Sequence, residues 1–327
     1  MNTSISCLTL TLVTCALSVS VAAAAQPVSS YPIRPIRLIV PFGPGAGVDV
    51  VGRIVGQKLT ESLGQTIVID NRSGAGGTLG ASIAAKATPD GYTLVMGSVG
   101  SLGTSKGLYK DLPYDPIKDF APITLAARAP SGLLVHAALP IKTTSELIAY
   151  AKTNPGKLNA ASAGNGSPSH LAWEMLKSMT GIRIVHVPYK GPAQALQAVA
   201  SGEAQMQIQS LLSAMPHIQA GRMRLIATTG AMRSSLFPDT PTVSEAAPRF
   251  EVYTWFGMLA PAGTPSSIIQ KLNANIVAVL KQSDVRKYLV NQGAEVVGNK
   301  PGEFAKFIEQ EAAKWTKAIK ESGARVG

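Results

Sequence analysis

From residue 36 onward, short apolar runs rich in β-branched residues alternate with stretches in which apolar residues recur at helical spacing. Residues 36–42 (IRLIVPF), 65–71 and 92–98 have the pattern of buried strands, and residues 49–63 and 76–86 have the pattern of helices. Short apolar runs bounded by glycine and proline are typical of strands. The order strand, helix, strand, helix, strand therefore predicts a parallel sheet flanked by helices.

A second series follows a proline-rich stretch at residues 113–130. Thr143 and Glu146 have the spacing of a capping box, which predicts a helix that ends at residues 154–156 (NPG). Further strands are predicted at residues 158–163, 182–189, 204–210 and 223–229, and further helices at residues 168–179, 192–201, 266–282, 284–291 and 301–321.

Two α/β series followed by C-terminal helices predict two lobes, the first completed by the C-terminus. We expect one lobe to comprise residues 26–127 together with 248–327, and the other residues 128–247. Ligands of such sheets bind at the carboxyl ends of the strands. The expected ligand cleft therefore lies at those ends, between the lobes.

The first 25 residues contain no Asp, Glu, Lys or Arg and end in four alanines, at residues 22–25. Their apolar stretch is shorter than the roughly 20 residues that span a membrane. This pattern predicts a secretory signal cleaved near Ala25, and hence a periplasmic protein, with a retained membrane anchor as the alternative. Cys7 and Cys15 both lie in this segment, and Thr14 before Cys15 disfavours a lipoprotein. The mature chain is therefore expected to have no thiol, disulfide or cysteine-based metal site.

The net charge of +11 comes from scattered Lys and Arg residues. Nucleic-acid-binding proteins concentrate basic residues on one face, often interleaved with aromatics. No such run occurs in the sequence. The charge therefore indicates a basic surface that attracts anions rather than a nucleic-acid partner.

The loop at residues 43–49 (GPGAGVD) joins a predicted strand to a helix. Its glycines let backbone N–H groups approach a ligand, and a helix start favours negative charge. Asp49 either caps the helix and braces the loop or contacts the ligand. A second loop, residues 71–77, matches neither G-x-G-x-x-G nor a Walker motif, which argues against nucleotide binding. The candidate ligand contacts of the first loop are Phe42, Gly45, Ala46, Gly47 and Asp49.

Residues 162–170 (SAGNGSPSH) form the most informative segment. Ser167 is a favoured N-cap and Pro168 suits the first helical position. Amides exposed by glycines, together with hydroxyls, predict an anion site built from neutral donors; an ordinary capped helix start is the alternative. Its candidate contacts are Ser162, Gly164, Asn165, Gly166, Ser167 and His170. We expect Ser167→Ala to weaken carboxylate binding with little loss of stability.

A periplasmic hydrolase that uses Ser167 or Ser169 with His170 is a rival function. No G-x-S-x-G elbow occurs, and the four histidines (His136, His170, His186, His217) lack metal-binding spacing. We therefore expect no catalytic residue, no metal and no cofactor. Side chains at the distal end of the ligand would set specificity; the candidates are Ser98, Ser101, Asn165, Tyr189, Gln209 and Thr254. Lys190 either pairs with a carboxylate or is solvated.

Seven segments, in this order and spacing, resemble the tripartite tricarboxylate transporter receptor (TctC) family, also called the Bug family of periplasmic binding proteins. They are YPIRPIRLIVPF (31–42), DNRSGAGGTLG (70–80), PDGYTL (89–94), LPYDPIKDF (112–120), ELIAYAKTNPGKL (146–158), HVPYKG (186–191) and WFGMLAPAGTP (255–265). The resemblance implies a type II binding fold with two lobes, each with a mainly parallel sheet flanked by helices, that close about a hinge.

By the same resemblance, backbone and small polar groups of residues 42–49 and 162–170, with bridging waters, would hold the carboxylate. The family usually has Pro-Gly-Gly where this chain has Ala46 after Gly45, and Ser73 replaces a usual proline. The added methyl at Ala46 is expected to narrow the cleft or restrict the backbone.

The implied function is that of a monomeric periplasmic receptor. It would pass a small carboxylate (a di- or tricarboxylate, an aromatic acid or an amino acid) to the membrane subunits of a tripartite tricarboxylate-type secondary transporter. A sensory binding protein that feeds a signalling partner is the remaining alternative.

Overall fold

The computed structural model describes residues 31–234 and 237–322, so the predicted signal segment lies outside the described residues. The strands are β1 (Ile36–Val40), β2 (Ile67–Asn71), β3 (Thr93–Ser98), β4 (Phe120–His136), β5 (Asn159–Ser162), β6 (Val185–Pro188), β7 (Met206–Ser210), β8 (Met223–Thr228), β9 (Tyr253–Pro261) and β10 (Glu295–Val296).

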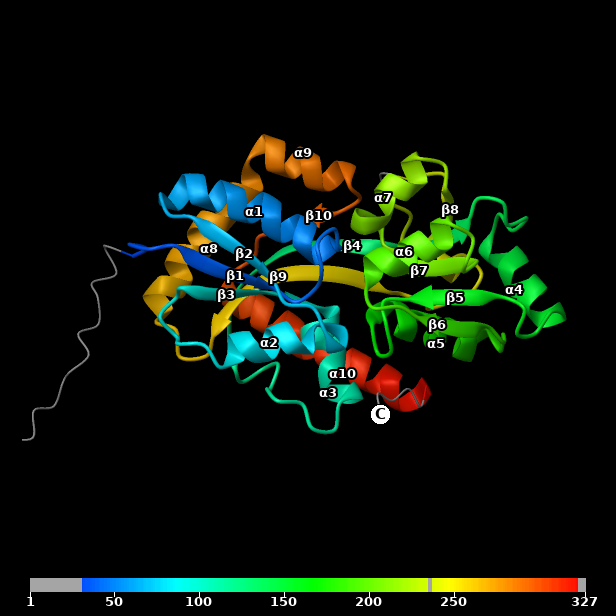
Figure 1. The fold of residues 1–327 in the computed structure, drawn as a ribbon, viewed down its shortest axis with the longest axis horizontal. Coiled ribbons are helices and arrows are strands. Elements are labelled where there is room, and N and C mark those ends of the chain that lie inside the picture. Colours follow the sequence, from blue (N-terminus) through cyan, green and yellow to red (C-terminus); the bar gives the residue numbers. More distant parts are fainter. Residues whose placement is uncertain (1–30, 235–236, 323–327) are drawn as a thin grey trace, which may run out of the picture. The chain divides into compact units, whose positions relative to one another are not determined.

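The helices alternate with these strands over most of the chain (Figure 1). The α-helices are α1 (Gly47–Leu63), α2 (Thr78–Ala85), α3 (Ser105–Leu108), α4 (Thr144–Thr153), α5 (Pro168–Thr180), α6 (Pro192–Ala200), α7 (Leu211–Gln219), α8 (Ser266–Lys281), α9 (Ser283–Asn291) and α10 (Pro301–Ser322). The short helical turns are η2 (Ala75–Gly77), the π-helical η3 (Val99–Thr104) and η4 (Val243–Glu245).

The strands are hydrogen-bonded in the order β2-β1-β3-β9-β4-β7-β5-β6, with β8 and β10 also paired to β4. Pairing is parallel among β1, β2 and β3 and among β5, β6 and β7. It is antiparallel wherever β4 or β9 takes part. The predicted α/β fold is confirmed, but its centre is antiparallel, so the sheet is mixed rather than mainly parallel.

Two long strands, β4 and β9, pass between the β1–β3 group and the β5–β7 group (Figure 1). The first part of β4 pairs with β9 as far as Pro130, and from Ser131 onward β4 pairs with β7. Neither strand was predicted, and residues 113–130 were interpreted as a proline-rich connection. Pro122 lies at a register shift and Pro130 at the change of partner, positions where a sheet tolerates a missing N–H donor.

The helices and strands that the sequence did predict are present, with ends shifted by a few residues. The core follows from their apolar faces, and its largest buried side chains include Trp173, Trp255, Trp315, Phe250 and Phe304. Burying such side chains is the dominant favourable term in folding. Helix α10 packs against η3, α3 and β4, so the C-terminal segment returns to the β1–β3 group.

Candidate functional site

A cleft lies at the carboxyl ends of β1, β3, β5 and β7, where the sequence predicted it. It encloses about 550 Å³ of empty space, part of which is open to solvent. The lining residues are Phe42, Ala46, Gly47, Val48, Ser98, Val99, Gly100, Ser131, Ala163, Pro168, Ser169, Pro192, Ile208, Gln209, Ser210, Thr254 and Phe256.

The first loop is held from behind by Asp49, whose side chain is buried. Its Oδ2 accepts the Gly45 N–H at 3.0 Å and the Arg53 Nε–H at 2.9 Å, and its Oδ1 accepts from Asn71 Nδ2 at 2.9 Å. Asp49 is therefore a brace of the loop, which was one of its two predicted roles, and it does not line the cleft.

Helix α1 presents its N-terminus to the cleft through residues 46–48. Its N-cap position, Ala46, supplies no side-chain hydrogen bond to the helix. The first N–H groups of a helix need an acceptor from elsewhere, and they attract anions. A Cβ at Gly47 would lie 2.8 Å from the Phe256 ring and 3.1 Å from Ser210 Oγ. The helix start is therefore packed directly against these two cleft residues.

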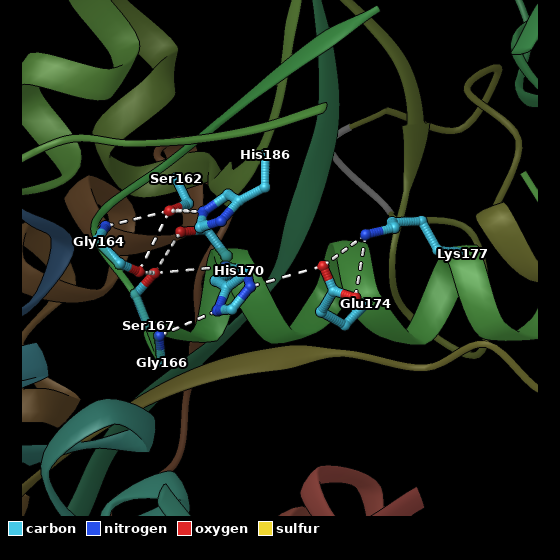
Figure 2. A network of polar contacts seen from close by, with 9 residues as sticks. Ser162, Gly164, Gly166, Ser167, His170, Glu174, Lys177 and His186 are labelled. Carbon is cyan, nitrogen blue, oxygen red and sulfur yellow. Dashed lines mark hydrogen bonds and ion pairs between the residues drawn. The ribbon is translucent and has the colours of Figure 1, made fainter. Parts of the chain in front are cut away.

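The second loop, residues 162–170, forms a closed network of hydrogen bonds (Figure 2). Ser167 Oγ donates to Gly164 O at 2.7 Å and accepts the His170 N–H at 3.3 Å, so Ser167 is the predicted N-cap of α5. Ser162 Oγ accepts the Gly164 N–H at 3.1 Å and contacts His186 Nε2 at 2.6 Å. Ser162 and Ser167 are fully buried, and neither lines the cleft.

His170 is oriented by the same network (Figure 2). Its Nδ1 accepts the Gly166 N–H at 3.0 Å, which puts the proton of the neutral ring on Nε2, 3.5 Å from Glu174 Oε1. The hydrogen bond with His170, reinforced by Lys177, lowers the pKa of Glu174 to about 2. The His170 ring bonds neither Ser167 Oγ nor Ser169 Oγ in the described structure, so the pair that the rival hydrolase function would need is not assembled.

Ser169 is the hydroxyl of this loop that reaches the cleft. Its Oγ accepts the Ala163 N–H at 3.0 Å and lies 3.0 Å from Ser167 Oγ. Because the proton of Ser167 is used by Gly164 O, Ser169 must be the donor in the contact between the two hydroxyls. Rotation of this O–H group would direct it to a ligand instead.

Part of the cleft lining comes from β4 and β9, strands that the sequence did not predict. Ser131 on β4 and Thr254 on β9 join their hydroxyls at 3.1 Å inside it. Thr254 was among the predicted specificity residues, whereas Ser131 was not. No local motif marks Ser131, because only the pairing of β4 brings it to the cleft.

Ser210, at the end of β7, is a lining residue that the sequence analysis did not predict, and its hydroxyl is the strongest candidate for a ligand contact. It is 3% exposed, and among the described residues its Oγ has no hydrogen-bond partner. Its neighbour Gln209 is different, because its amide accepts from Gln207 Nε2 and donates to Ser213 Oγ, both at 3.2 Å. A buried hydroxyl without a partner costs about 1–3 kcal/mol, so Ser210 is a candidate to bond a ligand or a water molecule in the cleft.

Five of the predicted ligand contacts line the cleft: Phe42, Ala46, Gly47, Ser98 and Gln209. The others do not: Gly45, Asp49, Ser162, Gly164, Asn165, Gly166, Ser167, His170 and Tyr189. Tyr189 donates its hydroxyl to Glu203 Oε1 at 2.8 Å, and Asn165 is exposed. Most of these residues shape the loops rather than the cleft surface.

The described part of the chain carries no group of three His, Cys, Asp or Glu side chains able to hold a metal ion. None of its helices is long and apolar enough to cross a membrane.

In this α/β chain, β9 and β4 lie between two groups of parallel strands, and a cleft lined by uncharged residues lies at the strand ends. This is the architecture of a solute-binding protein. The model of the tripartite tricarboxylate transporter family receptor matches residues 51–324. The chain belongs to this family, which confirms the predicted membership. A protein from the tcbD-tcbE intergenic region of Pseudomonas sp. strain P51 is 40% identical over 299 residues, which cover 91% of this chain and 89% of that protein.

Solved structures agree with this assignment. R. palustris Rpa4515 with adipate superimposes with a TM-score of 0.87 at 38% identity, covering 90% of this chain and 100% of that one. The periplasmic binding protein BugD gives a TM-score of 0.86 at 33% identity, covering 90% and 100%. MatC from Rhodopseudomonas palustris with bound malate gives 0.84 at 36% identity, covering 88% and 100%.

Proposed function

We propose that this chain is a periplasmic receptor that captures a small carboxylate in the cleft and delivers it to the membrane subunits of a tripartite tricarboxylate-type transporter. The observation that carries the proposal is Ser210, whose buried hydroxyl lies beside the start of α1 without a partner. A carboxylate oxygen at this point would accept from Ser210 and from the first amides of the helix.

Neutral donors suit a receptor that must both hold and release its ligand. A carboxylate bound by amides and hydroxyls gains directed hydrogen bonds and the favourable field of a helix N-terminus. It avoids a buried ion pair, whose desolvation can exceed its Coulombic gain. The cleft is lined by Ser98, Ser131, Ser169, Ser210 and Thr254 in addition to the α1 start, which is a donor set of this kind.

The family and its structures support the ligand class and the compartment. Two relatives with over 35% identity are structures with the carboxylates adipate and malate, and BugD is a periplasmic binding protein. The N-terminal segment with the pattern of a secretory signal fits export. We therefore place the mature chain in the periplasm, with cleavage near Ala25.

We further propose that residues 26–127 with 248–327 and residues 128–247 form two lobes that close on the ligand. The change of partner of β4 between Pro130 and Ser131 supports a hinge close to the predicted boundary. The paired hydroxyls of Ser131 and Thr254 lie next to this point, so closure would bring ligand and hinge into contact.

The test is a binding screen of the chain from residue 26, unfolded and refolded to remove any bound solute. A carboxylate at about 100 times its dissociation constant adds about 2.7 kcal/mol of stability, which raises the melting temperature visibly. We expect at least one small acid to bind saturably in calorimetry, and Ser210→Ala to weaken it at least tenfold. Ser178→Ala, an exposed serine of α5, is the matched control and should bind as the wild type does.

Two results would count against the proposal: a screen of small acids in which none binds, or Ser210→Ala binding unchanged. The transporter partner needs its own experiment. Cells that lack this chain should lose uptake of the acid identified in the screen, whereas a sensory protein would leave uptake intact and alter gene expression.

A further inference from the structure

Gln207 is a polar residue in the apolar core, two residues from the cleft. It lies on β7, where it is paired with Leu134 of β4 on one side and with Ala161 of β5 on the other. All three residues are fully buried, and α6 and α7 pack on β7. Among the described residues, Gln207 Oε1 has no hydrogen-bond partner. An amide oxygen buried in this way costs about 1–3 kcal/mol, so Gln207 is unfavourable at this position unless its amide has a function.

The amide of Gln207 is bonded to that of Gln209, which lines the cleft. Alternate residues of a strand have their side chains on the same face of the sheet, so the two amides are neighbours. Gln207 Nε2 donates to Gln209 Oε1 at 3.2 Å, and Gln209 Nε2 donates to Ser213 Oγ at 3.2 Å. Ser213 Oγ in turn donates to Ser210 O at 3.1 Å. These three hydrogen bonds form a chain that begins in the core and ends on the backbone.

The backbone carbonyl at the end of this chain fixes its direction. A carbonyl oxygen can only accept, so Ser213 uses its one proton on Ser210 O and must accept from Gln209. The amide of Gln209 therefore turns its NH2 group to Ser213 and its oxygen to Gln207. If both amides were turned round, Ser213 would have to donate to Gln209 and the bond to Ser210 O would be lost. The observed direction is the one that keeps all three bonds.

This direction leaves one N–H group of Gln209 available to a ligand. Nε2 carries two protons, and among the described residues it makes one hydrogen bond, to Ser213. Gln209 is partly exposed and lines the cleft, whereas Gln207 is buried and does not line it. Gln209 can therefore offer a donor in the cleft while its oxygen is bonded to Gln207 behind it.

We infer that Gln207 is a positioning residue for ligand recognition, which holds the amide of Gln209 so that an N–H group, rather than the oxygen, faces the ligand. This role rests on the proposed carboxylate receptor and adds a second recognition point to it, an acceptor atom of the ligand at Gln209. A second carboxylate group is an acceptor of this kind. An amide held in the opposite sense would turn its oxygen to that group and repel it. The unpartnered oxygen of Gln207 is then the consequence of using its NH2 group to orient Gln209.

Gln207→Met tests this role, because it keeps the length of the side chain and removes the donor. Adipate and malate are the probes, since each carries two carboxylates, and the tighter of the two is used throughout. In calorimetric titrations of the mature chain the variant should bind the probe roughly fivefold more weakly, the effect of one neutral hydrogen bond. Its melting temperature should be unchanged or higher, because methionine leaves no unpartnered oxygen in the core.

Gln197→Met is the matched control, because Gln197 is exposed on α6 and does not line the cleft. It should equal the wild type in both affinity and melting temperature. A lower melting temperature of Gln207→Met with unchanged affinity for the probe would make Gln207 a structural residue and overturn the inference.

A double-mutant cycle separates an effect through Gln209 from a general disturbance of the cleft. Gln209→Met should weaken binding of the probe by a similar factor. Gln207→Met should add nothing in the Gln209→Met background, because the amide that it positions is then gone. Additive losses would show that Gln207 acts on the cleft by another route, which overturns the inference.

Proton NMR of the side-chain amides, with the protein labelled in nitrogen, follows Gln209 without any ligand. The signals that disappear in Gln209→Met belong to this residue. Gln207→Met should shift or broaden them, because the hydrogen bond that holds the amide is lost. Unchanged Gln209 signals in Gln207→Met would overturn the inference, even if the variant binds the probe too weakly to titrate.

The proposed function and the role of Gln207 can fail separately. If no small acid binds, the proposed function is wrong. If other acids bind but neither adipate nor malate does, the carboxylate receptor stands and the assignment of an acceptor atom to Gln209 is overturned.

Discussion

The imidazole rings of His170 and His186 stack face to face, with centroids 3.9 Å apart and planes 13° apart. The contact joins the start of α5 to β6 behind the second loop (Figure 2). Burial, together with the neighbouring His170, lowers the pKa of His186 to about 4. Protonation of His186 at low pH would therefore affect its contact with His170 and, through it, the second loop.

The free energy of unfolding should fall as the pH is lowered from about 6.5 to about 4. Over this range the unfolded chain protonates His186, whose ordinary pKa is 6.5, whereas the folded chain resists protonation until about 4. Glu174 contributes in a lower window, because its pKa falls from 4.5 to about 2 and its stabilisation is lost between those values. Denaturant unfolding at pH 7.5, 6.0 and 5.0 measures the slope.

His186→Gln removes the titrating ring and keeps a group able to bond Ser162. The variant should show a shallower pH dependence than the wild type over the same range. Parallel slopes in the two proteins would show that other groups control acid sensitivity.

Ser167→Ala should lower stability by about 1 kcal/mol, because it removes the N-cap of α5. This revises the expectation from the sequence, in which the substitution weakened binding and spared the fold. Ser169→Ala is the matched change at the cleft surface, and it should weaken ligand binding more than Ser167→Ala does. Thermal melts and titrations of both variants measure the two effects, and the opposite ranking of affinities would contradict the geometry.

Asp49→Asn should destabilise the protein by about 1–3 kcal/mol. Both carboxylate oxygens of Asp49 accept hydrogen bonds, and the variant would place an NH2 donor against one of the N–H donors that now bond them. Ligand affinity should fall as well, since Gly45 would no longer be held. Arg53 is half exposed, so Arg53→Gln should cost less than about 1 kcal/mol. Equal losses in the two variants, measured by denaturant unfolding, would be inconsistent with a brace centred on Asp49.

Glu311 lies buried between two indoles, and its Oε2 accepts from Trp255 Nε1 at 2.9 Å and Trp315 Nε1 at 3.1 Å. Glu311→Leu leaves both donors without an acceptor and should cost on the order of 3 kcal/mol. Glu311→Gln keeps an acceptor oxygen and should cost less than half as much. Unfolding curves monitored by tryptophan fluorescence compare the two, and equal losses would mean that packing rather than these hydrogen bonds is responsible.

Local pattern was sufficient to predict the helices, the strands of the parallel parts of the sheet and the capping of α5. It was also sufficient to locate both loops, since the residues that shape a strand-to-helix turn are close in sequence. Ser167 and Asp49 were recognised for this reason. The Ser167 hydroxyl and the Asp49 carboxylate, however, form hydrogen bonds within their own loops. Sequence pattern does not reveal these bonds, because they depend on the three-dimensional path of each loop.

The sequence by itself determined that this chain is an α/β protein of the tripartite tricarboxylate transporter receptor family, with neutral donor groups at the starts of its helices. Only the tertiary structure decided which of those groups reach the cleft. Ser131, Ser210 and Thr254 meet there because β4 pairs with both β7 and β9, strands that follow it much later in the sequence; Ser131 and Thr254, for example, are 123 residues apart. Long-range strand pairing depends on the packing of the whole core and leaves no local motif, so a hydroxyl such as that of Ser210 becomes a candidate ligand donor only once the fold has formed.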